Sequence, residues 1–317
     1  MKNPDSESRS RRRWLAGIGG GALGLMLGDA GAAGGAGTGN AIPGATGMGG
    51  ASARKVAGAG MSALANAPAN ALPVAVVGGL AMAGLWSPLA KAATAETGVA
   101  MRLVATAPKE GVVPVFRAGS AGLLLIHGGD EAFALAAQGL ALPPRPWAMN
   151  EHVIVGPPDD PAGIAGAANG AEALARIRAA DAPMLLFRDP GGFAIVQALW
   201  RASGQRPGPR QQLYDDSEQP QQVLLSAARQ GAYVLVGRIP VLFGRMPNAG
   251  LKILLQGDPT MRRVYVAAEP GPAHPADAAT RVAARAIADW LLAPAGQARI
   301  AALPALDGLP LLYPLPG

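Results

Sequence analysis

Cysteine is absent from this 317-residue chain, and histidine occurs only as His127, His152 and His274. The lack of cysteine excludes disulfide bonds, thiolate nucleophiles and cysteine-based zinc or iron–sulfur sites. Three histidines far apart in the sequence argue against a His-ligated metal or a His-based catalytic triad. Aromatic residues make up 4% of the chain, and 44 glycines mean that the 50% hydrophobic fraction overstates the core. We therefore expect no metal and no cofactor.

The basic residues are concentrated near the N-terminus. The chain carries a net charge of +6. Residues 1–94 hold eight basic and three acidic side chains, whereas residues 95–317 hold 19 basic and 18 acidic ones. A nucleic-acid-binding protein needs its Lys and Arg clustered on the folded body. A nearly neutral body therefore argues against a nucleic-acid partner.

The first 95 residues are predicted to be an export leader with a disordered Gly/Ala-rich segment. Residues 10–15 (Ser-Arg-Arg-Arg-Trp-Leu) fit the twin-arginine export pattern, and a glycine-diluted apolar run follows them. Residues 29–70 are low in complexity and have almost no large apolar side chains, so they cannot offset the loss of chain entropy on folding.

A second apolar stretch covers residues 71–90. Its length of about 20 residues is enough to span a bilayer, but Pro73, Pro88 and its glycines make a poor membrane helix. Small-residue cleavage patterns follow at residues 90–95. The stretch is either the end of one long leader, the signal of a chain that starts further downstream, or a membrane anchor. A cleaved leader predicts a periplasmic protein whose mature domain starts near residue 96.

Strand-like and helix-like segments alternate from residue 96 onward. The predicted strands are 101–107, 122–127, 152–156, 184–187, 233–236, 251–255 and 264–268, and the predicted helices are 130–139, 170–180, 193–202, 223–230, 277–292 and 296–303. Residues 112–116 fit either a helix or a strand. This alternation predicts the α/β class, with parallel sheets in one or two lobes.

Several motifs of this body occur in a recognisable order. Residues 150–164 read Asn-Glu-His-Val-Ile-Val-Gly-Pro-Pro-Asp-Asp-Pro-Ala-Gly-Ile. The other motifs are Leu-Leu-Leu-Ile-His at 123–127, Gly-Ala-Tyr-Val-Leu-Val-Gly-Arg at 231–238, Leu-Lys-Ile-Leu-Leu-Gln-Gly-Asp-Pro at 251–259, Ala-Asp-Trp-Leu with Pro-Ala-Gly-Gln at 288–297, and Tyr-Pro at 313–314. Together they resemble tungstate-binding proteins of ABC importers, over roughly residues 100–317.

The resemblance implies a type II periplasmic-binding-protein fold, with two α/β lobes joined by two crossover strands and the ligand between them. The crossovers would fall near residues 155–157 and 238–240. Lobe 1 would then comprise residues 96–155 and 240–317, and lobe 2 residues 156–239. Only 15 residues separate Ala107 from Leu123, where the family has a helix, a strand and a further turn. The first lobe is therefore expected to be diverged and shortened.

The clearest candidate site is the turn at residues 188–193 (Arg-Asp-Pro-Gly-Gly-Phe). It follows a predicted strand and opens a predicted helix that Asp189 can cap, so Arg188, Gly191 and Gly192 are predicted to bind an anion. The family's turn reads Arg-Gly-Asp-Asp-Ser-Gly-Thr, so Arg188 matches its arginine while the hydroxyls are lost. The competing interpretation makes Arg188 a surface charge beside a capped helix.

Two further candidate ligands are hydroxyls. Thr106 stands where the family has Ala-Thr-Thr-Thr-Ser-Thr after its first strand, and Ser217 stands where the family has Glu-Thr-Gly-Gln-Gly. Thr106 also fits a buried residue at a strand end. The carboxylates of Asp215, Asp216 and Glu218 beside Ser217 would repel a dianion.

The sequence thus predicts a monomeric solute-binding protein that takes a small oxyanion, such as tungstate or molybdate, to an ABC permease in the inner membrane. The alternative is a diverged binding-protein fold that acts as an exported sensor or interaction module without oxyanion transport. An enzyme is not expected, because the Ser120 segment only half matches a nucleophile elbow and no phosphate-binding loop is present.

Overall fold

A computed structural model describes residue 68 and residues 70–215, 217 and 219–316. The twin-arginine pattern at residues 10–15, and nearly all of the low-complexity segment, lie outside the described residues and stay predictions. Within the described ranges, no helix combines the length and the apolar character needed to cross a membrane.

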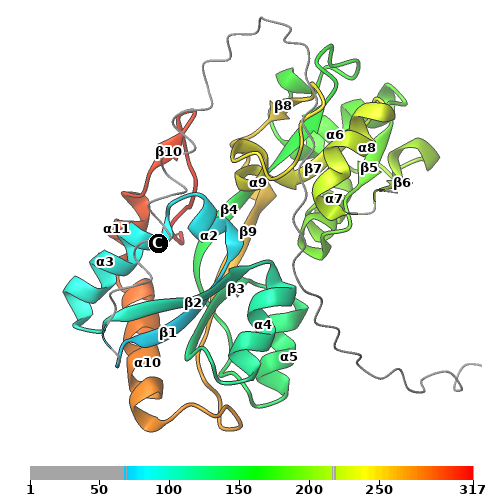
Figure 1. The fold of residues 1–317 in the computed structure, drawn as a ribbon. Helices are drawn as coiled ribbons and strands as arrows, with labels where there is room; N and C mark the ends of the chain where they lie inside the picture. The colour runs from blue at the N-terminus through cyan, green and yellow to red at the C-terminus, as the bar shows by residue number, and fades with distance from the viewer. Residues whose placement is uncertain (1–67, 69, 216, 218, 317) are drawn as a thin grey trace, which may run out of the picture. The chain divides into compact units, whose positions relative to one another are not determined.

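The described chain alternates strands and helices, as the sequence predicts (Figure 1). The strands are β1 (Leu72–Val77), β2 (Met101–Ala107), β3 (Leu123–His127), β4 (Arg145–Gly156), β5 (Met184–Leu186), β6 (Leu213–Tyr214), β7 (Tyr233–Gly237), β8 (Lys252–Leu255), β9 (Arg262–Ala268), β10 (Ala305–Leu306) and β11 (Leu309–Pro310). The helices are α2 (Gly78–Met82), α3 (Trp86–Thr97), α4 (Lys109–Arg117), α5 (Asp130–Ala137), α6 (Gly170–Ala179), α7 (Pro190–Ala202), α8 (Val223–Arg229), α9 (Arg238–Leu242), α10 (Ala278–Leu292) and α11 (Pro294–Ala301). The ambiguous segment 112–116 is therefore helical.

The strands form two groups that share β4. In lobe 1 the order is β2-β1-β3-β9-β4, where β1 pairs in parallel with β2 and β3, and β9 runs antiparallel to β3 and β4. In lobe 2 the order is β6-β5-β7-β4-β8, where β5 is parallel to β6 and β7, and β4 is antiparallel to β7 and β8. The parallel strands of each lobe end at one edge of its sheet, where α/β proteins place their ligands.

Each lobe has its own hydrophobic core. The continuous apolar run of β3 packs in the lobe 1 core, and all of Leu123–Ile126 is at most 1% exposed. In lobe 2, Ile154 of β4 packs in one cluster while Val153 and Val155 pack in another. Because side chains alternate along a strand, this sheet is covered on both faces.

The two crossovers are β4 and β9, which lie side by side (Figure 1). The first half of β4 pairs with β9, and residues from His152 onward pair with β7. The first crossover therefore lies slightly before the predicted residues 155–157. At the second predicted crossover, residues 238–240, the chain does contact lobe 1, because Ile239 packs in the lobe 1 core. It does not stay there: β8 pairs with β4 in lobe 2, and the strand that leads back into the lobe 1 sheet is β9.

Lobe 1 starts earlier than the sequence predicts. The stretch expected to end a cleaved leader forms β1, α2 and α3, and β1 lies between β2 and β3. Val74, Ala75 and Val76 are fully buried there. The predicted start of the lobe near residue 96 is therefore wrong. The predicted shortening is wrong as well, because the strand and helices that seemed to be missing after Ala107 precede it.

Candidate functional site

The predicted strand-to-helix turn is present in lobe 2. β5 ends at Leu186 and α7 begins at Pro190, whose missing N–H is no loss in a first turn. The Asp189 carboxylate accepts a hydrogen bond of 2.8 Å from the N–H of Gly192, which confirms the predicted cap. First-turn N–H groups have no acceptor within their helix, so the N–H of Gly191 can serve a ligand.

Arg188 and Ser217 contact each other directly. The Arg188 guanidinium donates a hydrogen bond to the Ser217 carbonyl oxygen, and its Nε lies 3.7 Å from Oδ2 of buried Asp215. The Ser217 hydroxyl donates to the carbonyl of Gln219 at 3.0 Å. Ser217 therefore holds the loop beside Arg188, while the Arg188 side chain is still 46% exposed.

Thr106 lies on β2, the edge strand of lobe 1, opposite Val76 of β1, and it is exposed. The interpretation of Thr106 as a buried strand-end residue is therefore wrong. The prediction that its segment follows the first strand of the lobe is also wrong, because that strand is β1. The residues after β1 are Gly78 and Gly79, which carry no hydroxyl.

Lys109, Glu131 and Arg263 meet at Gly129, where α5 begins. Lys109 Nζ donates to Glu131 Oε2 at 2.7 Å. A Cβ atom on Gly129 would lie 3.6 Å from that oxygen and 3.9 Å from both Lys109 Nζ and Arg263 Nη2. Burial alone would raise the pKa of Glu131, but the hydrogen bond and charge of Lys109, a backbone hydrogen bond and the charge of Arg263 together outweigh burial, and the pKa is lowered. This corner therefore holds one ionised carboxylate and two cations.

Arg263 joins the crossover strand β9 to the turn of lobe 2. Its Nη1 donates to Asp189 at 2.9 Å (Oδ2) and 3.2 Å (Oδ1), and His152 Nε2 lies 3.8 Å from Asp189 Oδ2. Burial favours the protonated form of Asp189. The neighbouring His152, Arg263 and Gly192 N–H outweigh it, and the pKa of Asp189 is strongly lowered. Asp189 is thus ionised and paired.

His127 is the last residue of β3 and lies near Arg263 and Asp189. Its ring lies 4.4 Å from that of Tyr265, centroid to centroid. Burial lowers the pKa of His127 well below its usual value, and the nearby Arg263 and His152 lower it further. The imidazole is therefore neutral at physiological pH and can donate or accept one hydrogen bond at each nitrogen.

Three basic side chains at these turns each have a carboxylate partner. The pairs are Lys109 with Glu131, Arg263 with Asp189, and Arg188 with Asp215. An oxyanion that binds here must therefore compete with these carboxylates. Among the described residues, no group of three or more His, Asp or Glu side chains is arranged to hold a metal ion.

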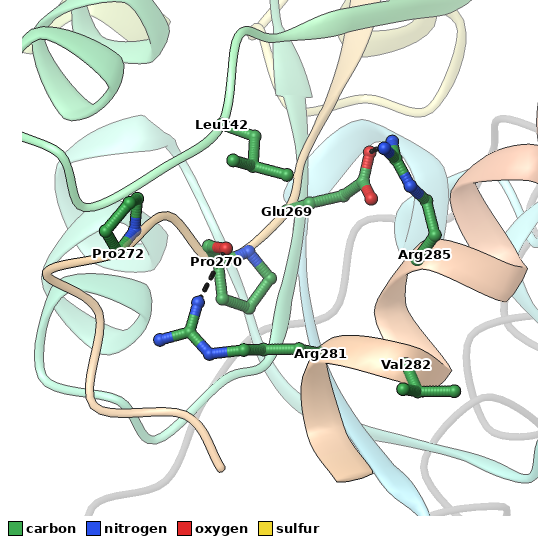
Figure 2. A pocket seen from close by; sticks show the side chains of 7 residues that line it. All are labelled: Leu142, Glu269, Pro270, Pro272, Arg281, Val282 and Arg285. Carbon is green, nitrogen blue, oxygen red and sulfur yellow. Dashed lines mark hydrogen bonds and ion pairs between the residues drawn. The ribbon is translucent and has the colours of Figure 1, made fainter. Parts of the chain in front are cut away.

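A separate pocket of about 410 Å³ lies in lobe 1, away from these turns (Figure 2). Glu269 reaches Arg285 across it at 3.2 Å, and the Arg281 guanidinium donates to the carbonyl of Pro270 at 2.9 Å. Arg281 also donates to the carbonyl of His274. Backbone carbonyls accept the hydrogen bonds of the Arg281 guanidinium, and Glu269 adds negative charge to the pocket. The pocket therefore does not suit an oxyanion.

The sequence interpretation did not single out Lys109, His152 and Arg263, which the structure places at or next to the candidate turn. Two successive arginines, Arg262 and Arg263, precede an apolar run, and the predicted strand began only after them. In the structure, Arg262 lies over the Tyr313 ring at 3.7 Å and Arg263 reaches Asp189. Charged residues at the start of a buried strand were the available signal.

No protein-family model matches the sequence. A Haloferax volcanii protein, named as a candidate ABC transporter anion-binding protein, is 30% identical over 204 residues. That match covers 62% of this chain and 58% of the relative, so the chain spans less than two thirds of the relative's length.

Two solved structures share the fold. A tungstate-binding protein from Desulfovibrio alaskensis has a TM-score of 0.60 and 27% identity, with 77% of this chain and 98% of the other covered. A tungstate ABC transporter protein from Geobacter sulfurreducens has a TM-score of 0.59 and 23% identity, with 75% and 100% covered. The chain is thus similar to tungstate-binding proteins, and its described part has the type II periplasmic-binding-protein fold.

Proposed function

We propose that this protein is an extracytoplasmic solute-binding protein that binds a small oxyanion of the tungstate or molybdate kind and delivers it to an ABC permease. The two-lobed fold with two crossover strands supports this proposal, because lobes joined in this way close on a ligand by a hinge motion. The similarity to the D. alaskensis tungstate-binding protein supports the same ligand class.

The observation that carries the proposal is the turn between β5 and α7. It combines the Arg188 guanidinium, a helix N-terminus capped by Asp189, and Gly191 and Gly192, which allow close approach of the backbone. Backbone N–H groups at a helix N-terminus and a planar guanidinium bind tetrahedral oxyanions without a metal. Lys109 and Arg263 add positive charge from lobe 1 and from the crossover strand.

Binding then requires Arg188 to exchange partners. Its Nε lies 3.7 Å from Asp215, too long for a good hydrogen bond, and nearly half of its side chain is exposed. Two oxygen atoms of a tetrahedral oxyanion can accept hydrogen bonds from the Arg188 guanidinium, while Asp215 stays close enough to balance the charge of Arg188. Closure of the lobes removes water and strengthens these contacts.

A second function is supported by the carboxylates. Each basic side chain of the site is already paired, and the turn after β1 has Gly78 and Gly79 with no hydroxyl. Such a site is balanced in charge without an oxyanion, which is what an exported sensor or interaction module requires.

Isothermal titration with tungstate, molybdate, sulfate and phosphate separates the two functions. An oxyanion-binding receptor is expected to bind at least one of these anions saturably, at one site per chain. Absence of binding to all four would overturn the oxyanion proposal and support the sensor. A chain expressed from residue 68 is suitable, because all described elements lie beyond that residue.

We also propose that the protein is exported, by the twin-arginine route. The support is the pattern at residues 10–15 followed by a glycine-diluted apolar run. Fractionation of cells that express the full chain tests this proposal, since an exported receptor is recovered from the periplasm.

A further inference from the structure

We infer that Arg263 contacts the anion in the proposed oxyanion site. Asp189 is the counter-ion of Arg263 when no anion is bound, and the bound anion replaces Asp189 at the Arg263 guanidinium. The inference rests on the proposed function and extends it to residues of the crossover strand. It also names the ligand class as a doubly charged tetrahedral oxyanion.

The guanidinium of Arg263 lies directly against the first turn of α7. A side chain at Gly191 would collide with it, so this approach requires glycine. The N-terminus of a helix carries a partial positive charge, and a cation placed there is destabilised unless an anion balances it. Asp189 supplies a single negative charge for both the helix N-terminus and the Arg263 guanidinium, so further negative charge at this position is favourable.

The same guanidinium has donor capacity beyond its ion pair. Arg263 is 9% exposed, and within the described residues its Nε has no hydrogen-bond partner. Both bonds to Asp189 come from Nη1. His152, 3% exposed, likewise has an Nδ1 without a partner among the described residues. Of these groups, Arg263 Nε lies against Gly191, where an added Cβ atom would collide with it, and the His152 ring lies beside Gly192. An oxyanion at this turn can accept hydrogen bonds from Arg263 Nε and from the Gly191 N–H.

The geometry selects the charge of the ligand. The cap and the shorter bond from Arg263 share Oδ2 of Asp189, but their donors are different groups, so Asp189 can keep its cap on Gly192 while it gives up Arg263. The anion then replaces one carboxylate charge at Arg263. A dianion gains more from this exchange than a monoanion of equal size. Tungstate is therefore expected to bind more tightly than perrhenate, its singly charged isostere.

Titration of tungstate into Arg263→Ala and Asp189→Asn tests the inference. Arg263→Ala is expected to lose roughly 30- to 1000-fold in affinity, the scale for a buried charged donor. Arg263→Lys should recover part of that loss, because an ammonium group lacks the planar fork. Asp189→Asn should bind tungstate more tightly than the wild type, because asparagine still caps the helix and no longer competes for Arg263.

Matched controls are Arg285→Ala and Asp277→Asn. Both lie in lobe 1, away from the turn: Arg285→Ala removes an arginine–glutamate pair with Glu269, and Asp277→Asn makes the same substitution at a helix cap, that of α10 on the N–H of Thr280, which has no ion pair among the described residues. Both should keep wild-type affinity. Circular dichroism and melting curves verify folding, and if Arg263→Ala fails to fold, Arg263→Lys and Asp189→Asn decide.

The outcomes are distinguishable. Unchanged tungstate affinity in the Arg263 variants that fold, together with weaker or unchanged affinity in Asp189→Asn, makes the ion pair purely structural and overturns the inference alone. Perrhenate that binds as well as tungstate overturns the assigned charge class. A wild type that binds no oxyanion overturns the proposed function and this inference with it.

Discussion

Replacing Arg188 with alanine should weaken oxyanion binding strongly. Loss of a charged donor from a closed site costs about 2–4 kcal/mol, or roughly 30- to 1000-fold in affinity. The Arg188 side chain is 46% exposed and Asp215 competes for it, so we expect the low end of this range, about 2 kcal/mol. Arg188→Lys should recover only part, because an ammonium group has no planar fork.

The same substitution should also lower stability, through Asp215. Its carboxylate is fully buried, and Arg188 is its cationic neighbour at 3.7 Å. Breaking a fully buried ion pair costs about 3–5 kcal/mol, but solvent screens the exposed arginine, so about 1–2 kcal/mol is expected. At this chain length each kcal/mol lowers Tm by about 2–4 °C. Arg188→Ala with Asp215→Asn should recover most of that loss, because no buried charge then remains unpaired.

Calorimetric titration with tungstate at about 0.1 M and about 1 M salt measures the binding effect. A direct contact keeps most of its contribution in high salt, whereas a distant attraction is screened. Arg201→Ala is the matched control, because Arg201 is exposed in the last turn of the same helix, α7. Equal affinity of the wild type and Arg188→Ala for every oxyanion that binds would remove Arg188 from the site.

Three further predictions concern the N-terminal boundary, export and pH. A chain without residues 1–67 should keep the wild-type Tm, whereas a chain without residues 1–95 loses β1 and should not fold. Each buried Val or Leu of β1 contributes about 1.5–3 kcal/mol, and the total stability of a protein is about 5–15 kcal/mol. Circular dichroism distinguishes the folded from the unfolded truncation. The double substitution Arg11→Lys with Arg12→Lys should leave the full chain in the cytoplasm, and normal export would contradict the twin-arginine route. Because the pKa of His127 is lowered in the folded state, the unfolded chain binds the extra proton below about pH 6.5, so Tm should fall as the pH falls through that value, and His127→Phe should make melting curves less pH-dependent.

Local features of the sequence were sufficient to predict the turn of lobe 2. Asp189, Pro190 and two glycines between an apolar strand and an amphipathic segment specify a capped helix start, and the structure has it. The apolar run of β3 likewise predicted a strand covered on both faces. Both depend on neighbours within a few residues, where sequence patterns are most informative.

The start of lobe 1 could not be read in the same way. β1 is an apolar segment of six residues, Leu72–Val77, followed by Gly78 and Gly79 and the small residues of α3. Composition does not distinguish such a buried strand and helix from a signal segment, because both are apolar and rich in alanine. The difference lies in the partners of β1, and these are β2 and β3, further along the chain.

The absence of hydroxyl side chains from the turn after Arg188 argues less strongly against oxyanion binding in the structure than in the sequence alone. Seen alone, the residues after Arg188 have lost the Ser and Thr of the family's turn, which argues against an oxyanion. In the fold, Arg263, 74 residues after Asp189, lies against the same turn, and Lys109 and His152 are nearby in lobe 1 and on β4. A guanidinium donates to oxyanion oxygens at least as strongly as a hydroxyl does. If the proposed function holds, the residues of this turn alone therefore do not determine which anion binds, because Arg263 of the crossover strand lies against the same turn.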